Sequence, residues 1–506
     1  MTPPRQDGLA MDNTAFRRIG HSLVDTVATF LDSLPDRAVT RHRTPAELRA
    51  VLDADRPLPE AGADPETLLG RAAELLMSES LFNGHPRFFG YVTASPAHIG
   101  ILAELLAAAV NANVGAHQLA PIATEIEAQT VRWIAELIRY PGDCGGLFVS
   151  GGNMANFTAL LTARAAAAEW NVRAAGIGDA SAQPFRIYAS EETHTWVQKG
   201  ADMAGIGTDA IRWIPTDAAL QIDVGCLRTT LEQDRKDGAR PLMVIATAGS
   251  VSTGAVDPLF ELADVCRAAD VWLHVDGAYG AFAAGVPGAP PALQGLSLAD
   301  SVAVDPHKWL YAPIEAGCVL VRDREALRRT FSFHPTYYHF GQEVTNYVDF
   351  GPQNSRGFRA LKVWLALQHV GREGYRKSIA EDMRLSRELY AHVDVHPELQ
   401  ALTQMLSITT FRYVPPGLAD SSAHAGVAAY LNALNHRLLD RLQESGEAFV
   451  SNAVIDGQFA LRACIVNFNT CEADVAALPD VVAKMGRAVA AEMDEQASTN
   501  VSGASA

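Results

Sequence analysis

One lysine of this chain stands where the amine of a reactive side chain would be expected. The sequence holds only six lysines, and Lys308 alone follows directly on a short apolar run, in SVAVDPHKWLYAP. Such a run predicts a buried strand, and open α/β sheets bind their ligands at the carboxyl ends of strands. Between His307 and Trp309 the amine would be partly desolvated, which favours the neutral form that attacks a carbonyl carbon. The alternative is an ordinary lysine in a surface loop, and position alone does not decide between the two.

A carboxylate ends a second apolar run earlier in the chain. Asp276 follows Trp-Leu-His-Val in WLHVDGAYG. Its charge could hold the proton of a pyridine nitrogen, because the protonated ring is the form that accepts electrons. Gly277, Ala278 and Gly280 are small enough for a flat ring to lie against the backbone. A single aspartate at a strand end is more often a helix cap or a magnesium ligand, but together with Lys308 it predicts a specific cofactor site.

A glycine turn would bind the other end of that cofactor. In FVSGGNMAN the pair Gly151 and Gly152 links an apolar run to a helix, and bare amides at a helix N-terminus bind anions without a basic side chain. His194, in EETHTW, could stack its imidazole on the ring; the alternative is an ordinary histidine at the start of a helix. A phosphate site, a carboxylate and an amine in this order predict pyridoxal 5'-phosphate, bound as a Schiff base through Lys308.

The spacing of apolar residues predicts the elements that position these groups. Between about residues 96 and 322 short apolar strands alternate with helices, for example 153–174 and 259–269. This alternation predicts an α/β fold with a mainly parallel seven-stranded sheet sandwiched by helices. The strands are expected at 147–150, 186–190, 211–214, 242–247, 272–275, 301–304 and 318–321.

A chain of 506 residues is too long for a single hydrophobic core. We expect residues 13–95 to form a helical arm or cap, residues 96–357 a large cofactor-binding α/β domain, and residues 358–494 a smaller C-terminal α+β domain. The segments 1–12 and 495–506 are rich in small and polar residues, which predicts disorder.

The overall charge excludes some partners. The formal net charge is −17, so nucleic acid and anionic membrane surfaces would be repelled. The longest apolar run, 99–110, is too short to cross a bilayer, and the N-terminal residues lack the apolar core of a signal peptide. Six scattered cysteines without a CxxC pair are typical of a reducing compartment. We therefore expect a cytoplasmic protein, and one without a metal site, because no HExxH or similar ligand spacing occurs.

The motifs that carry these residues resemble those of a known family. DPHKW, HVDGAYG, SGGNMAN and HPRFFGY are similar to motifs of the group II pyridoxal-phosphate-dependent decarboxylases, over roughly residues 15–490. NSRGFRALKVW and LAPIATEIE resemble the aromatic L-amino acid decarboxylase branch of that family. The resemblance implies fold type I, the aspartate aminotransferase-like architecture, and a homodimer with shared active sites in which the N-terminal arm wraps around the partner. It also implies decarboxylation of an L-amino acid to the amine and carbon dioxide.

The resemblance assigns a role to each candidate at the cofactor. Lys308 matches the Schiff-base lysine, and Asp276 matches the partner of the pyridinium nitrogen. Ala278 and His194 match the residues packed against the two ring faces. Asp305 replaces an asparagine often found in the family and is not counted as a ligand, because a carboxylate would repel phosphate unless it is turned away. The matches at the phosphate are Gly151, Gly152, Asn153, His307 and, less closely, Ser250.

A tyrosine in FHPTYY separates two possible products. Tyr337 matches a mobile-loop tyrosine that protonates Cα in the family, with His194 in a supporting role; loop packing is the alternative for Tyr337. Relatives that form aldehydes with oxygen tend to carry phenylalanine at this position or another residue at the stacking histidine. The presence of both Tyr337 and His194 therefore favours the amine as product.

The substrate is expected to be an aromatic amino acid, namely tyrosine, dopa, phenylalanine or tryptophan. In plant relatives a serine at the position of Ser355 goes with phenolic substrates. The residues that match the family's side-chain pocket are Phe89, Tyr91, Val92, Thr93, His117 and Ser355.

Four other functions, in three groups, stay open. An aldehyde synthase or a decarboxylase of a non-aromatic amino acid would share these motifs. An aminotransferase would need an arginine that grips the α-carboxylate, for which Arg356 and Arg462 are candidates. A non-catalytic, regulatory cofactor-binding protein is a third alternative, although no appended DNA-binding helix-turn-helix is visible.

Overall fold

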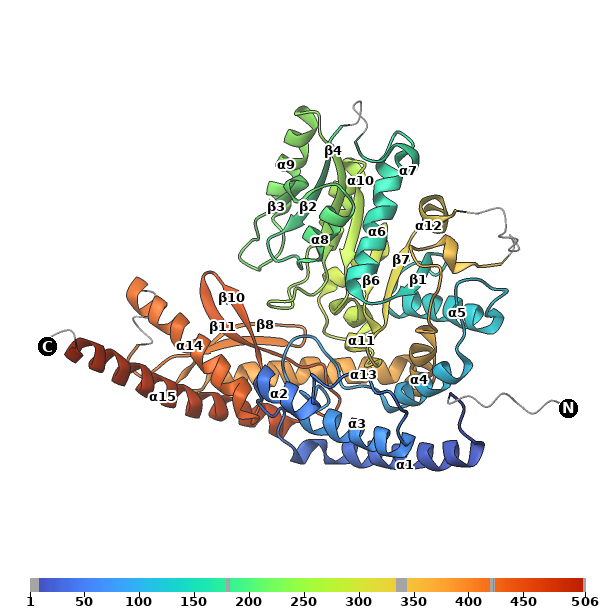
Figure 1. Ribbon diagram of the computed structural model, residues 1–506. Coiled ribbons are helices and arrows are strands. Elements are labelled where there is room, and N and C mark those ends of the chain that lie inside the picture. Colours follow the sequence, from blue (N-terminus) through green and yellow to red (C-terminus); the bar gives the residue numbers. More distant parts are fainter. Residues whose placement is uncertain (1–8, 179–182, 334–343, 419–421, 423, 504–506) are drawn as a thin grey trace.

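A seven-stranded sheet forms the centre of the larger part of the molecule (Figure 1). The computed structural model describes residues 9–178, 183–333, 344–418, 422 and 424–503, with the backbone alone for 497–503. The strand order is β1-β7-β6-β5-β4-β2-β3; β7 is antiparallel to both its neighbours, and the other pairs are parallel. The predicted fold class is therefore confirmed. The strands are β1 (Gly145–Val149), β2 (Phe185–Ser190), β3 (Ile211–Ile214), β4 (Arg240–Thr247), β5 (Trp272–Asp276), β6 (Ser301–Val304) and β7 (Gly317–Val321).

Helices cover both faces of this sheet, which is why its strands appear in the sequence as apolar runs. Successive side chains of a strand point to opposite faces. Val244 of β4 packs in one hydrophobic core with Leu259 of α10, whereas the preceding Met243 packs in another with Leu160 of α6 and Trp196 of α8. The helices are α5 (Pro121–Leu137), α6 (Gly152–Ala167), α8 (Trp196–Met203), α9 (Val224–Lys236) and α10 (Leu259–Ala268).

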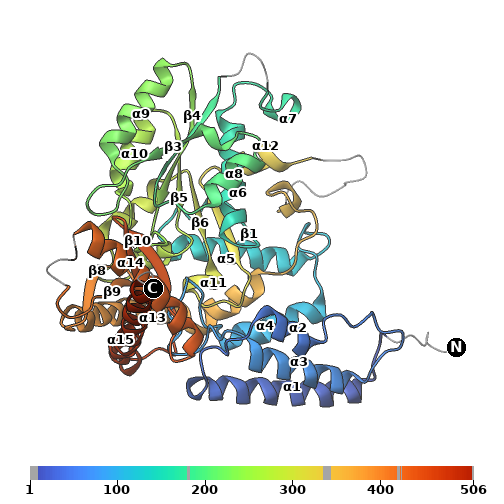
Figure 2. The ribbon, with the colours of Figure 1, turned by 60° about the vertical axis from the view of Figure 1, so that its left-hand side comes forward.

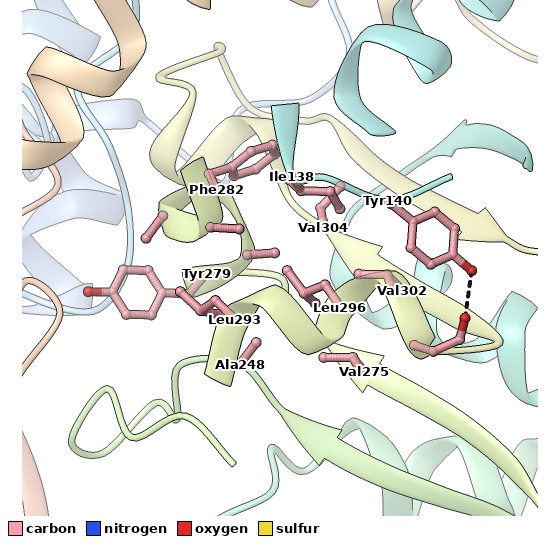
Figure 3. Close-up of a cluster of buried hydrophobic side chains, with 14 of the residues drawn as sticks. Ile138, Tyr140, Ala248, Val275, Tyr279, Phe282, Leu293, Leu296, Val302 and Val304 are labelled. Carbon is pink, nitrogen blue, oxygen red and sulfur yellow. Dashed lines mark hydrogen bonds between the residues drawn. The ribbon is translucent and has the colours of Figure 1, made fainter. Parts of the chain in front are cut away.

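The core on the α10 side fixes the chain that follows β5. Leu293 and Leu296, in the 3-10 helix η4 (Pro291–Leu298), pack in one cluster with Val275 and Val302 of the sheet (Figure 3). Tyr279 belongs to the same cluster and is 2% exposed. Asp276 is therefore held between a buried strand and a buried turn.

The helix predicted over 153–174 is interrupted, which corrects that expectation. α6 ends at Ala167, and a separate short helix, α7, spans Val172–Ala175. Trp170 lies in the break: its ring stacks on Phe185 of β2 with centroids 5.4 Å apart, and its Nε1 donates to the carbonyl of Gly176 at 2.8 Å. These contacts favour a turn over a continuous helix.

A second, four-stranded antiparallel sheet lies in the C-terminal part, with strand order β10-β11-β9-β8. The long helix α13 (Ala360–Asp394) has residues in both the large core and the core of this smaller part, and it is kinked at Gly371. α15 extends to Gly503, so a helix covers part of the tail for which the composition predicts disorder. The elements are β8 (Leu399–Met405), β9 (Ile408–Tyr413), β10 (Ser451–Ile455), β11 (Gln458–Cys464), α14 (Ala425–Ser445) and α15 (Glu472–Gly503).

The N-terminal helices form a separate layer at the foot of the molecule, beside α4 (Figure 2). Pro45 and Pro65 each occupy the first turn of a helix, where the missing amide costs nothing. Among the residues that the structure describes, none of the helices combines the length and the apolar character needed to cross a bilayer. The helices are α1 (Asn13–Ser33), α2 (Pro45–Leu52), α3 (Pro65–Glu79) and α4 (His98–Val110).

Candidate active site

A cavity of about 330 Å³ lies where β1, β5 and β6 lead into the segments that carry the predicted chemistry. β5 ends in Asp276, and β6 leads through Asp305 into the short helix α11 (Pro306–Trp309), which carries Lys308. The volume lies in the range of small-molecule sites. Predicted residues that line the cavity are Gly151, Gly152, Asn153, His194, Asp276, Ala278, His307 and Lys308; further lining residues include Asn156, Thr247, Gly249, Tyr279 and Asp305.

The glycine turn presents the start of α6 to this cavity. Gly151 has φ +120°, a conformation that a residue with a Cβ rarely adopts, and it caps α6 without any side-chain hydrogen bond. A Cβ on Gly152 would lie 2.7 Å from Oδ2 of Asp305 and 3.3 Å from Cβ of Ala278. The turn therefore combines an uncapped helix N-terminus with a close fit to the cavity wall, which is the geometry of an anion site.

The amine of Lys308 has a carboxylate partner. Its Nζ lies 3.1 Å from Oδ2 of the buried Asp305, and the Lys308 side chain is 22% exposed. The other oxygen of Asp305, Oδ1, is buried without a hydrogen-bond partner. His307 donates from Nδ1 to the carbonyl of Ala316 at 2.8 Å, and its Nε2 is 3.8 Å from Asp305. The carboxylate that departs from the family pattern is therefore turned toward the lysine amine.

The segment after Lys308 is held by buried contacts that sequence reasoning missed. Asp382 of α13 accepts hydrogen bonds from Nε1 of Trp309 at 2.8 Å and from the hydroxyl of Tyr311 at 2.6 Å. Trp309 also stacks on Tyr279, with ring centroids 4.7 Å apart. Burial raises the pKa of Asp382 to about 7, although both hydrogen bonds oppose the shift. These contacts fix the backbone from which Lys308 projects.

Asp276 ends the neighbouring strand β5 and is 8% exposed. Its Oδ1 accepts from the amide of Ala278 at 3.2 Å, and its Oδ2 accepts from Nδ2 of Asn156 at 3.1 Å. Asn156 was not predicted; the only sequence signal was a second asparagine in SGGNMAN, one helical turn beyond Gly152 on α6. The carboxylate is thus oriented by two donors at the edge of the cavity.

His194 lines the cavity and is an exposed residue in the single chain. Its Nδ1 accepts from the amide of Trp196 at 3.2 Å, so the neutral ring carries its proton on Nε2. Partial desolvation lowers the pKa of His194, the charge of Lys308 acts in the same direction, and Asp276 opposes the shift. A neutral imidazole is therefore favoured beside this cavity.

Several predicted residues do not meet at this cavity. Ser250 is buried and accepts hydrogen bonds within its own loop, from the amides of Thr253 and Ala255, both at 3.3 Å. Phe89 is fully buried in the core of the smaller part of the chain. Tyr337 lies outside the described residues. The other predicted pocket residues that do not line the cavity are Tyr91, Val92, Thr93, His117 and Ser355.

Those pocket residues belong to two separate parts of the chain. Tyr91 is attached to the smaller sheet, because its amide donates to Oγ of Ser451 at 3.3 Å. His117 and Ser355 lie in loops joined beside β1: the amide of Val114 donates to the carbonyl of Arg356 at 2.9 Å. The single chain therefore brings together the predicted cofactor residues other than Ser250, but it does not assemble the predicted substrate pocket.

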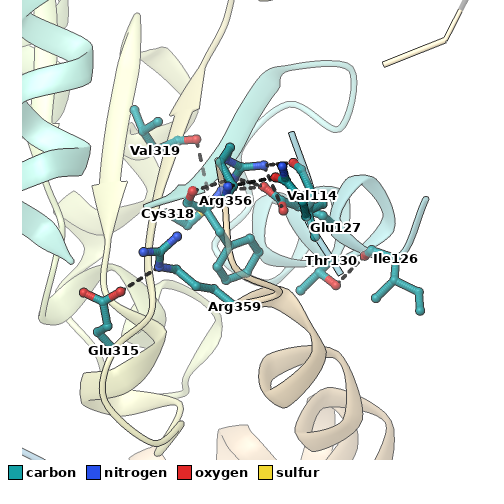
Figure 4. A network of polar contacts seen from close by, with 11 residues as sticks. Val114, Ile126, Glu127, Thr130, Glu315, Cys318, Val319, Arg356 and Arg359 are labelled. Atoms are coloured by element: carbon teal, nitrogen blue, oxygen red, sulfur yellow. Dashed lines mark hydrogen bonds and ion pairs between the residues drawn. The ribbon is translucent and has the colours of Figure 1, made fainter. Parts of the chain in front are cut away.

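Arg356 forms a buried ion pair and is therefore not available to bind the α-carboxylate of a substrate. It pairs with Glu127 of α5, and both side chains are at most 1% exposed (Figure 4). Arg356 also donates to the carbonyls of Val114 and Phe148, each at 2.7 Å. Arg462, the other candidate, is buried and donates to the carbonyl of Tyr91 at 3.0 Å. The ion pair of Arg356 removes one of the two candidates for the single arginine that an aminotransferase would need.

The residues present fit pyridoxal phosphate. An uncapped helix start suits the phosphate, an aspartate held by two donors suits the ring nitrogen, and Ala278 and His194 border the space between them. Lys308 supplies a primary amine on the same cavity wall. Anion site, carboxylate and amine thus face one space, as this cofactor requires.

Comparisons with known proteins point in the same direction. The family model for the pyridoxal-dependent decarboxylase conserved domain matches residues 45–414. The chain is 33% identical to an aromatic-L-amino-acid decarboxylase of Bacillus atrophaeus over 92% of this chain and 94% of that protein. It is 32% identical to a tyrosine decarboxylase of Oryza sativa subsp. japonica, over 92% and 89% of the two chains. The solved structure of Oryza sativa TDC with PLP and tryptamine superposes with a TM-score of 0.87 at 26% identity, covering 96% and 99%.

Proposed function

The chain belongs to the pyridoxal-dependent decarboxylases, and from this membership we propose that it removes the α-carboxylate of an aromatic L-amino acid, releasing the amine and carbon dioxide. One observation carries the proposal: Lys308 and Asp276, at the ends of the neighbouring strands β6 and β5, face one cavity with the uncapped start of α6. The relatives named as aromatic-L-amino-acid and tyrosine decarboxylases support the aromatic substrate.

Each of these groups has a separate task in that reaction. Bound pyridoxal phosphate supplies a protonated ring that takes up the electron pair left when the bond between Cα and the carboxylate breaks. Lys308 would supply the amine that holds the cofactor until substrate binds. The carboxylate of Asp276 would keep the ring nitrogen protonated, and the start of α6 would bind the phosphate without adding a cationic side chain. His194 would lie against one face of the ring and Ala278 against the other, since both line the cavity.

Proton delivery to Cα belongs to Tyr337 in this proposal. The partial desolvation of His194 keeps that ring largely neutral, so it is suited to orient a neighbouring donor rather than to act as a strong acid. Replacing Tyr337 by phenylalanine should change the ratio of amine to aldehyde. A Tyr337→Phe variant with the wild-type product ratio would remove this role from the tyrosine.

The proposal includes a homodimer in which each active site uses residues of both chains. The helical arm (13–95) and α4 expose several large apolar side chains, and exposed apolar surface is often a site of protein association. The two separate groups of predicted pocket residues support the same assembly, since a second copy can bring one group to the other. The exposed side chains are Phe16 (61%), Leu68 (55%), Leu76 (67%), Leu102 (53%), Leu105 (58%), Leu106 (52%) and Val110 (64%).

A cytoplasmic location completes the proposal. All six cysteines are unpaired in the structure, which supports a compartment that keeps thiols reduced.

The catalytic proposal is tested with a panel of amino acids, measuring carbon dioxide, amine and aldehyde together. Wild-type protein should release carbon dioxide and amine in equal amounts from aromatic substrates. Lys308→Ala should lose turnover and the absorbance of the Schiff base. Lys484→Ala is the matched control, because Lys484 is an exposed lysine paired with Glu447 on the surface. Turnover that survives in Lys308→Ala, or that is lost equally in both variants, would refute the assignment.

The dimer is tested by placing a charge on its expected surface. Leu105→Glu puts a carboxylate on the exposed face of α4 and should shift the molar mass in solution from dimer to monomer, with loss of activity. Val395→Glu is the control, because Val395 is 81% exposed at the end of α13 and lies in the other part of the chain. A Leu105→Glu variant that remains dimeric and active would contradict the proposed interface.

A further inference from the structure

A chain of buried hydrogen bonds lies behind Asp276 on β5. Positions 272, 274 and 276 of this strand point to the same face of the sheet, because side chains alternate along a strand. Trp272, His274 and Asp276 therefore share the face covered by α6, which brings in Asn156, while the neighbouring strand β6 contributes Ser301. His274, Ser301 and Asn156 are each at most 1% exposed.

Four hydrogen bonds connect these five residues in series. Nε1 of Trp272 and Nδ1 of His274 each lie 2.8 Å from Oγ of Ser301. Nε2 of His274 lies 2.7 Å from Oδ1 of Asn156, and Nδ2 of Asn156 lies 3.1 Å from Oδ2 of Asp276. The series runs from a half-buried indole to the carboxylate at the cavity.

The two ends fix the direction of every hydrogen bond between them. An indole N–H can only donate, and a carboxylate can only accept. Asn156 therefore turns its amide nitrogen to Asp276 and its oxygen to His274, which must donate from Nε2. Nδ1 of His274 then accepts from the Ser301 hydroxyl, whose oxygen in turn accepts from Trp272. Each proton in the series points toward Asp276.

The environment of His274 agrees with that single arrangement. A neutral ring protonated on Nε2 satisfies both neighbours, whereas a second proton on Nδ1 would face the hydroxyl that donates to it. Burial lowers the pKa of His274 to about 4, with Asp276 acting in the opposite direction. Trp196 packs edge-on against the ring, with centroids 5.8 Å apart at 85°. The ring is thus neutral and held in one orientation.

We propose that Asn156 and His274 are positioning residues that hold the carboxylate of Asp276 aimed at the cofactor's ring nitrogen. An asparagine amide is nearly symmetric in shape, so without His274 it could rotate and present its oxygen to the carboxylate, which repels it. The N–H of His274 excludes that rotation. The aligned donors also polarise one another in a low-dielectric interior, which strengthens the last hydrogen bond to Asp276. The inference rests on the proposed function, because it assigns the ring nitrogen to Asp276.

The test reads the ring nitrogen directly and does not depend on decarboxylation. Holoenzyme is prepared with pyridoxal phosphate labelled with ¹⁵N in the ring, and the nitrogen chemical shift reports whether it carries a proton. Wild-type protein should show a protonated nitrogen, and Asn156→Leu a reduced protonated fraction. The kcat of Asn156→Leu should fall about 10- to 100-fold with KM nearly unchanged, as expected for losing a hydrogen bond to a charged group.

Two substitutions of similar size at His274 separate positioning from packing. His274→Gln keeps an N–H that can donate to Asn156, so its ring nitrogen should stay protonated and its kcat should fall by less than about fivefold. His274→Leu removes the donor and should resemble Asn156→Leu. Equal nitrogen shifts in the glutamine, leucine and wild-type proteins would overturn the proposal. If the wild-type protein shows a protonated ring nitrogen but does not decarboxylate any aromatic amino acid, the result would instead count against the proposed function.

A measurement on the wild-type protein covers the case in which the variants do not fold. With ¹⁵N-labelled histidine, His274 should appear as a neutral ring protonated on Nε2 and should not titrate between about pH 5 and 9, given its buried position. A His274 ring protonated on Nδ1, or one that titrates in this interval, would overturn the proposed direction of the hydrogen bonds.

Discussion

Removing the negative charge of Glu127 while keeping its shape should destabilise the protein strongly. Glu127 and Arg356 form an ion pair at most 1% exposed, and the second contact, between Nη1 and Oε2, measures 3.2 Å. In Glu127→Gln the guanidinium would remain buried without a counter-charge. Breaking a buried pair from one side costs about 3–5 kcal/mol of unfolding free energy, because the remaining charge cannot return to water.

A further contact distinguishes two variants of this glutamate. The amide of Phe148, near the end of β1, donates to Oε1 of Glu127 at 2.9 Å. Glutamine keeps an oxygen for that amide, whereas Glu127→Ala leaves it without an acceptor. We expect the alanine variant to lose a further ~1–3 kcal/mol, the cost of a buried donor without a partner. Because Phe148 lies shortly before the glycine turn, the alanine variant should also bind the cofactor more weakly.

The assay is urea unfolding of the cofactor-free protein, followed by tryptophan fluorescence and far-UV circular dichroism. Coincidence of the two transitions is required before midpoints are converted to free energies, since a chain of this size can unfold in steps. The control is the double variant Glu127→Leu/Arg356→Met, which replaces both charges and should be more stable than Glu127→Gln. A loss under about 1 kcal/mol in Glu127→Gln, or a double variant as unstable as the sum of the single losses, would refute the reasoning.

Two further changes test the cofactor site and its support. Gly152→Ala places a Cβ 2.7 Å from Oδ2 of Asp305. The resulting overpacking costs about 1–3 kcal/mol and should raise the Kd for pyridoxal phosphate roughly tenfold. Gly178→Ala is the control, because there is open space around Gly178, and it should leave that Kd unchanged. Burial raises the pKa of Asp382 to about 7 in the folded protein, whereas in the unfolded chain this carboxyl loses its proton near pH 4. The stability that it contributes is therefore fully present below about pH 4 and is lost as the pH rises through about 7. Relative to Asp382→Asn, the wild-type unfolding free energy should therefore fall across that interval by up to about 1.4 kcal/mol per pH unit; parallel pH profiles of the two proteins would contradict the buried titration.

The strands of the large sheet were predictable because burial on both faces leaves an unbroken apolar pattern. β6 has the predicted bounds, and β5 extends one residue further, to Asp276, because that aspartate still pairs with Ala303 of β6. The start of β4 was missed because its first residue, Arg240, is polar and pairs with Glu169 at 2.6 Å. A pattern of apolar residues carries no information about such contacts.

The residues proposed to hold the cofactor could be picked out from the sequence because most of them lie at or just after a strand end or in the glycine turn, where their residue types are unusual. Asn156, Glu127 and Asp382 were missed for the opposite reason: each is a polar residue inside a helix, where most such residues face solvent. Only the packing of the helix on the sheet decides that these are buried and paired. Phe89 shows the converse, since its motif resembles a pocket segment although its side chain fills a core.

The large sheet and the arm impose different requirements on activity. The residues proposed to hold the cofactor project from strand ends and helix starts within one rigid core, so a single chain can preorganise them. The predicted pocket residues instead belong to two separate parts of the chain. Tyr91 is hydrogen-bonded to the smaller sheet, and Ser355 lies in a loop beside β1. In the proposed dimer a second copy would bring the two groups together, and the exposed apolar side chains of α1, α3 and α4 are the surface proposed for that association. Cofactor binding should therefore depend mainly on the fold of one chain, whereas substrate binding should depend on association of two.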